Sequence, residues 1–100
     1  MMGEKITVPD TFQEDIRRAV EILKAAGCTD IFLFGSLAQE RAGTSSDLDL
    51  AIRGCPPGNF FPVCGKLLMT LDHLVDLVDL DSPDPFARYL EEEEELVQIA

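Results

Sequence analysis

Two short motifs in this chain could perform chemistry together. Gly35 and Ser36 follow an apolar run, and such a turn at the start of a helix can hold a phosphate on its backbone N–H groups and its hydroxyl. Asp47 and Asp49 follow after a spacer of ten residues, 37–46, and their carboxylates can hold a divalent metal ion. A site that contains both parts is suited to the chemistry of nucleotides.

The two aspartates lie on one side of an expected strand over 48–53. Residues two apart in a strand point to the same face, so Asp47 and Asp49 present neighbouring carboxylates. Two such anions repel and raise each other's pKa, and a divalent cation removes that conflict. The alternative is an exposed strand face or a loop cap. The apolar opposite face, with Leu50 and Ile52, instead favours a central strand.

A third carboxylate is expected from a later strand over 74–80. Asp76 and Asp79 lie three residues apart there, so a regular strand directs them to opposite sides. If this strand lies beside 48–53, one of them joins the aspartate pair, where it could complete a metal site and accept a proton. For Asp79 the favoured interpretation is turn chemistry with Asp81.

Sequence patterns predict the elements that must position these residues. Apolar spacing and turn residues predict helices over 11–26, 36–41, about 59–71 and from about 86, strands over 31–34, 48–53 and 74–80, and a loop over 42–46. Thr11 with Glu14, or Asp10, is expected to cap the first helix, Gly27 to end it, and Asn59 to lie near the N-cap of the third. The class is α/β (α+β), in the order α-β-α-β-α-β-α.

Length and composition indicate one globular domain over residues 1–100. The hydrophobic fraction of 46% is typical of a soluble protein, and neither a membrane span nor a secretory leader is expected. Cys28, Cys55 and Cys64 form no CxxC pair, which favours reduced thiols and a cytoplasmic location.

The charge of the chain is unevenly placed. The net charge is −11, which argues against direct binding to nucleic acid. Residues 72–100 hold ten acids and one base, whereas residues 1–71 hold nine acids and seven bases. A nucleotide polyphosphate would therefore depend on metal ions for most of its charge neutralisation.

The three motifs together resemble the minimal nucleotidyltransferase (MNT) family of the polymerase-beta-like superfamily. The resemblance rests on Phe34-Gly35-Ser36-Leu37-Ala38, on Ser46-Asp47-Leu48-Asp49-Leu50-Ala51-Ile52 and on Val75-Asp76-Leu77-Val78. It covers residues from about 12 to 97, and the ten-residue spacer matches MNT antitoxins. It implies a small mixed three-stranded sheet flanked by helices, with the polymerase-beta-like fold.

The resemblance also implies a role for each site residue. Gly35 and Ser36 would hold the triphosphate of ATP or another NTP, and Asp47 and Asp49 would bind two Mg²⁺ ions. Asp76 would bridge a metal and help deprotonate an acceptor hydroxyl, which attacks the α-phosphorus and releases pyrophosphate. The chain departs from the family at Gln39-Glu40, where Arg-Gly is common, so a cation near the polyphosphate is missing.

Three functions follow as hypotheses. The first is an enzyme that transfers AMP to a partner macromolecule, because the domain is too small to hold an acceptor in a second lobe. The resemblance implies that this enzyme is an antitoxin. It would inactivate a HEPN-domain ribonuclease toxin by adding AMP to a tyrosine of the toxin. The second is a non-catalytic module that neutralises a basic partner through the acidic region 72–100. The third, a nucleotide-binding regulator, is disfavoured.

The remaining aromatic residues and the histidine are expected to have structural roles. These are His73 as a surface or cap residue, Phe86 and Tyr89 in the core, and Phe60 and Phe61 beneath the sheet.

Overall fold

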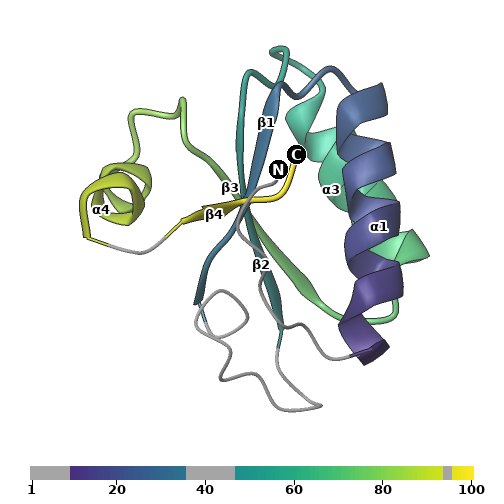
Figure 1. Ribbon diagram of the computed structural model, residues 1–100. Coiled ribbons are helices and arrows are strands. Elements are labelled where there is room, and N and C mark those ends of the chain that lie inside the picture. The colour runs from purple at the N-terminus through teal and green to yellow at the C-terminus, as the bar shows by residue number, and fades with distance from the viewer. Residues whose placement is uncertain (1–9, 36–46, 94–95) are drawn as a thin grey trace.

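The computed structural model describes residues 10–35, 47–93 and 96–100. Its helices are α1 (Asp10–Ala25), α3 (Phe60–Thr70) and α4 (Pro85–Glu93), and its strands are β1 (Asp30–Leu33), β2 (Leu48–Arg53), β3 (Val75–Asp79) and β4 (Val97–Gln98) (Figure 1). The helix expected over 36–41 and the loop over 42–46 lie outside the described residues.

The strands form one mixed sheet in the order β3-β2-β1-β4. β2 runs antiparallel to β1 and parallel to β3, and β4 pairs antiparallel with β1. The predicted α/β (α+β) class and the mixed sheet are confirmed. The prediction of three strands is wrong, because the described residues contain a fourth.

The error lies at the C-terminal end of the chain. A last helix was expected from about 86 with no strand after it, but α4 ends at Glu93 and β4 begins at Val97. The N–H of Ile99 donates to the carbonyl of Ile31 over 2.8 Å, and the N–H of Ile31 donates to Ala100 over 3.1 Å. Pairing with the open edge of β1 satisfies backbone groups and overrides a weak helical preference.

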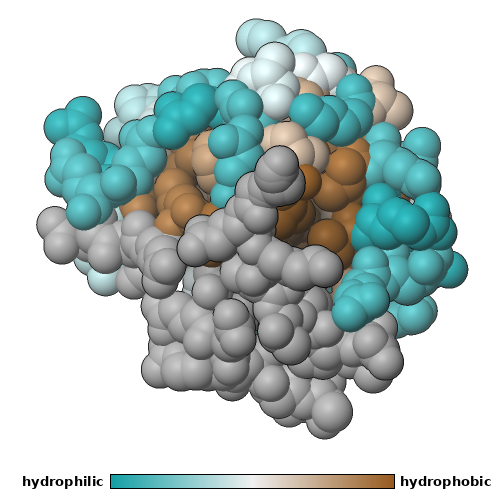
Figure 2. All heavy atoms as spheres, viewed as in Figure 1, coloured by the Kyte–Doolittle hydropathy of each residue, from teal (hydrophilic) through white to brown (hydrophobic). Residues whose placement is uncertain are grey.

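Helices cover both faces of the sheet, as Figure 1 shows, with α1 and α3 on one face and α4 on the other. The larger core lies under α1 and α3, where the alternate strand residues Ile31, Leu33, Leu48, Leu50 and Ile52 are buried with Phe12, Ala19, Leu23, Val63 and Leu67. A smaller cluster of Phe34, Ala51, Leu80 and Leu90 lies under α4. Hydrophilic side chains lie on the outer sides of α1 and α4 (Figure 2). Within the described residues, no helix combines the length and apolar content that a membrane crossing requires.

The predicted helix ends are partly confirmed, and the predicted burial of aromatic side chains is partly wrong. Gly27 does follow α1 with a φ of +103°. Asn59 occupies the N-cap of α3 but makes no side-chain cap, and its Nδ2 instead donates to the carbonyl of Ala26 over 2.7 Å. The predicted burial is wrong for three aromatic side chains, because Phe61 is 83% exposed and Phe86 and Tyr89 are about half exposed.

Candidate functional site

The parallel pairing of β2 with β3 brings two of the predicted site residues together. Asp49 is the register partner of Asp76. Their neighbours Leu48 and Leu50 are buried in the core under α1 and α3, so by strand alternation the aspartates lie on the opposite face. The sequence left open which aspartate of the third strand joins the pair, and the register identifies Asp76.

Asp79 has a different environment. It is the last residue of β3 and the register partner of Ile52. Its Oδ1 accepts a hydrogen bond from the N–H of Asp81 over 3.0 Å, and its carbonyl accepts one from Ser82 over 3.1 Å. The predicted turn role of Asp79 is therefore confirmed.

The carboxylate of Asp49 lies within the electrostatic reach of Asp76 and Asp47. Partial burial, acting together with the negative charges of Asp76 and Asp47, raises the pKa of Asp49 to about 6. Asp47 and Asp76 are themselves exposed. The face therefore holds concentrated negative charge that a cation would relieve.

Gly35 lies against this carboxylate face. Its φ is +73°, a conformation that other residues rarely adopt. A Cβ at this position would collide with Oδ2 of Asp49 and lie 3.2 Å from its Cγ. The preceding residue continues the pairing of β1 with β2, because the N–H of Phe34 donates to the carbonyl of Asp49 over 3.1 Å. The glycine turn and the aspartate motif therefore meet in space.

Two other parts of the prediction lie outside the described residues, namely Ser36 and the departure at Gln39-Glu40. A metal site is not assembled among the residues that are described, since no three His, Cys, Asp or Glu side chains there are grouped to hold an ion. The chemistry of the donors nevertheless fits Mg²⁺, because Asp47, Asp49 and Asp76 all offer carboxylate oxygens and the charges of Asp47 and Asp76 act on Asp49.

A buried carboxylate outside this face was missed by the sequence interpretation. Asp15, on α1, is 1% exposed. Its Oδ2 accepts hydrogen bonds from the N–H groups of Asp72 and His73, both over 2.9 Å, and lies 2.7 Å from Nδ1 of His73. The His73 ring stacks on Phe12, with centroids 4.0 Å apart. The expected surface or cap role of His73 is wrong as to surface, because its side chain is only 16% exposed.

These contacts tie α1 to the connection that leads into β3. Burial by itself would raise the pKa of Asp15, but the hydrogen bonds from His73 and Asp72 lower it overall. The sequence signal was an acid within the apolar stripe of the first helix, three residues after Phe12 and four before Ala19.

The three cysteines are free thiols, as predicted. Burial raises the pKa of Cys28 to about 12, and neighbouring Cys55 adds to the shift. Burial also raises the pKa of Cys64. Neither Cys28 nor Cys64 has the thiolate character of a reactive cysteine.

Comparisons with known proteins agree with this geometry. The family described as "Polymerase beta, Nucleotidyltransferase" matches residues 14–98. No curated protein sequence matches the chain.

Solved structures of toxin–antitoxin pairs are similar to this fold. A chain from a toxin–antitoxin crystal structure with AMP-PNP is 26% identical, with a TM-score of 0.62 over 88% of this chain and 72% of that one. A chain from an MntA–HepT structure is 24% identical, with a TM-score of 0.58 over 86% and 69%. A third chain, from a structure of a tri-AMPylated Shewanella oneidensis HEPN toxin in complex with MNT antitoxin, is 28% identical, with a TM-score of 0.51 over 72% of this chain and 58% of that one. The resemblance to MNT antitoxins is therefore confirmed, and the chain belongs to the polymerase beta nucleotidyltransferase family.

Proposed function

We propose that this chain transfers AMP from ATP to a hydroxyl of a partner protein, as the antitoxin of a HEPN-domain toxin. The observation that carries the proposal is the register pair Asp49 and Asp76, with Gly35 packed against the Asp49 carboxylate. Family membership supports the reaction class, as do the similar chains from structures that contain AMP-PNP or a tri-AMPylated HEPN toxin.

Each residue has a role in this proposal. Asp47, Asp49 and Asp76 would hold Mg²⁺, which when bound neutralises phosphate charge and stabilises the attacking and leaving oxygens. Gly35 and Ser36 would hold the triphosphate at the turn. Asp76, the most accessible of the paired carboxylates, would accept the proton of the acceptor hydroxyl as it attacks the α-phosphorus. Pyrophosphate would be the leaving group.

A second function is supported by the surface charge. Among the described residues after position 71, the exposed side chains include Asp72, Asp76, Asp81, Asp84 and Glu92. Such a surface suits a basic partner and could neutralise it by contact alone. This is the non-catalytic alternative.

The test is transfer of label from α-³²P-ATP with Mg²⁺ to a co-purified HEPN-domain protein encoded beside this chain. We expect Asp47→Asn, Asp49→Asn and Asp76→Asn each to lower transfer by at least about 100-fold, as loss of a metal ligand or base usually does. Asp79→Asn is the matched control for metal and nucleotide binding, because Asp79 lies on the same strand as Asp76 but in the turn contact with Asp81. Glu21→Gln, on the exposed side of α1, is the control for transfer.

Calorimetric titration with Mn²⁺ and AMP-PNP supplies a readout that does not need the partner. Wild-type protein and Asp79→Asn should bind both ligands, and Asp49→Asn should lose the metal. Toxin neutralisation that survives all three site substitutions would overturn the enzymatic proposal in favour of the binding module.

A further inference from the structure

The outer edge of β3 is open in the described part of the chain. β3 is the terminal strand of the sheet, paired with β2 alone. The carbonyl of Leu74 accepts from the N–H of Leu48, and the N–H of Leu80 donates to Ile52, both over 2.8 Å. Because backbone groups alternate along a strand, Asp76 and Val78 face β2, whereas Val75 and Leu77 direct their N–H and C=O groups outward.

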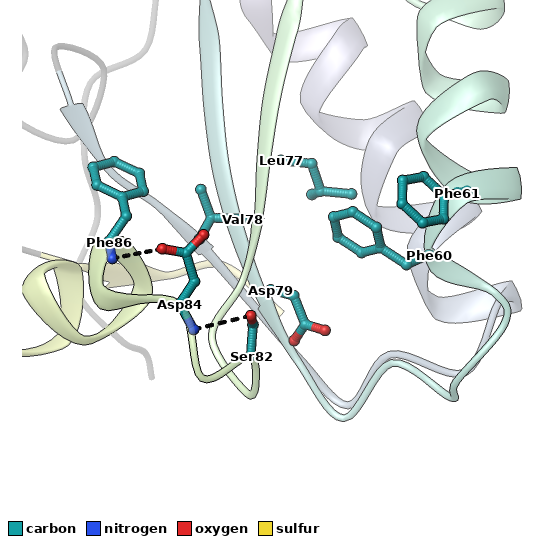
Figure 3. A pocket seen from close by; sticks show the side chains of 8 residues that line it. All are labelled: Phe60, Phe61, Leu77, Val78, Asp79, Ser82, Asp84 and Phe86. Carbon is teal, nitrogen blue, oxygen red and sulfur yellow. Dashed lines mark hydrogen bonds between the residues drawn. The ribbon is translucent and has the colours of Figure 1, made fainter.

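A cavity of about 570 Å³ lies along the same edge. Figure 3 shows that its lining residues flank β3 from both faces, with Phe60, Phe61 and Leu77 on the side of α3 and Val78, Asp84 and Phe86 on the side of α4. Phe61 is largely exposed and Phe86 is about half exposed. An extended segment that enters this groove would find apolar contacts for side chains on both of its faces.

The acidic side chains near the edge of β3 indicate which kind of segment would bind there. Asp76 and Asp79 lie on the strand, and Asp84 lines the groove. Pairing of β3 with β3 of a second copy would crowd the Asp76 and Asp79 carboxylates of both copies along one short strand pair, and like charges on neighbouring strands are destabilising. A segment rich in lysine or arginine would instead be attracted.

We propose that the acceptor hydroxyl is delivered by an extended, basic segment of the partner protein that adds as a strand to the free edge of β3. This inference rests on the proposed function. Strands lie about 4.8 Å apart, and residues alongside each other direct their side chains to the same face. A residue beside Asp76 would therefore direct its hydroxyl to the face that holds Asp49 and Asp76.

The strand period also predicts the sequence of the segment. Val78 lies two residues from Asp76 and borders the groove together with Phe86. A segment with a hydroxyl residue beside Asp76 places the residue two positions away beside Val78. The partner should carry a hydroxyl residue and an apolar residue separated by one position, with basic residues nearby.

Synthetic nine-residue peptides test the docking without nucleotide or metal. The first alternates valine and lysine around a central tyrosine. The second replaces each lysine by glutamate, and the third methylates alternate backbone nitrogens, which removes the donors of one edge. The readout is amide hydrogen exchange of β3 together with fluorescence-anisotropy affinity.

We expect the first peptide to slow exchange at Val75 and Leu77 at least tenfold, with little change at Asp76 and Val78, whose N–H groups already bond to β2. The methylated and acidic peptides should bind at least about tenfold more weakly. Phe86→Asp should weaken binding, whereas Met69→Asp, on an exposed α3 residue outside the groove, should not.

Three results would overturn the docking proposal. They are equal binding of the acidic peptide, protection without the alternation along β3, and sedimentation that shows the chain pairing with itself through this edge. Docking that is observed without any AMP transfer to the tyrosine or to the HEPN partner would count against the proposed function and leave the docking surface intact. Transfer of AMP to the partner with no protection of β3 from exchange would count against the docking proposal and leave the proposed function intact.

Discussion

The backbone of Gly35 occupies the space beside the Asp49 carboxylate that a side chain would need. A Cβ on Gly35 would collide with Oδ2 of Asp49, and the φ of +73° is itself unfavourable for other residues. The contact joins the turn after β1 to the centre of β2. Two motifs separated by ten residues in the sequence thereby form adjoining walls of one face.

Gly35→Ala should therefore lower the free energy of unfolding by more than an alanine substitution at a glycine that has a positive φ but no close neighbour. Gly58 is a matched control, because its φ is +90° and a Cβ there would meet nothing within 4 Å. We expect Gly58→Ala to lower the free energy of unfolding by about 1 kcal/mol, and Gly35→Ala by at least ~2 kcal/mol, in urea titrations. Equal losses would show that the Asp49 contact has no energetic consequence.

Asp49→Asn should stabilise the metal-free protein. The folded-state pKa of Asp49, about 6, lies above its ordinary value of 3.8. The native state therefore binds more protons between these values, and the contribution of Asp49 to stability falls as pH rises through that window. In EDTA at pH 7 we expect Asp49→Asn to have a free energy of unfolding higher than that of the wild type by on the order of 2 kcal/mol. This difference should disappear below about pH 4.

Addition of Mg²⁺ should make the wild-type protein more stable than Asp49→Asn. Wild-type protein should gain thermal stability as the cation binds, and Asp49→Asn should gain little, because ligands stabilise only the state that binds them. A stability of Asp49→Asn equal to wild type from pH 4 to 8 would show that the carboxylates are not in conflict.

Asp15→Asn should weaken the link between α1 and the start of β3. The hydrogen bonds to Asp15 lower its pKa, so its stabilising contribution is present above the ordinary value of 3.8 and is lost as pH falls through the lower folded value. We expect a loss of about 2 kcal/mol at pH 7 and a shallower acid limb in unfolding titrations. Glu14→Gln, on the exposed side of α1, should change the profile little.

Cys28 and Cys64 should be slow to alkylate in the native protein. Burial raises the pKa of both thiols, and the thiolate is the reactive form. With iodoacetamide at pH 8, mass spectrometry should show modification of both residues at least about tenfold slower than in urea. Rapid native labelling of Cys28 would contradict its burial in the core.

The sequence by itself determined the elements with strong periodicity and the site motifs. The strand over 48–53 was predicted at its observed bounds, because its alternation is complete and glycine and proline follow it. The same alternation placed Asp47 and Asp49 on one face, and the carboxylate chemistry indicated a metal. These features are local, since they depend on residues two or four apart.

Only the tertiary structure decided which distant residues meet. Strand order and register made Asp76, and not Asp79, the partner of Asp49. The open edge of β1 drew Ile99 and Ala100 into backbone pairing where the sequence predicted a helix. Asp15 reached the N–H groups of Asp72 and His73 across 57 and 58 residues of chain. Such pairings depend on which backbone and side-chain groups remain unsatisfied once the layers pack, and no local pattern contains that information.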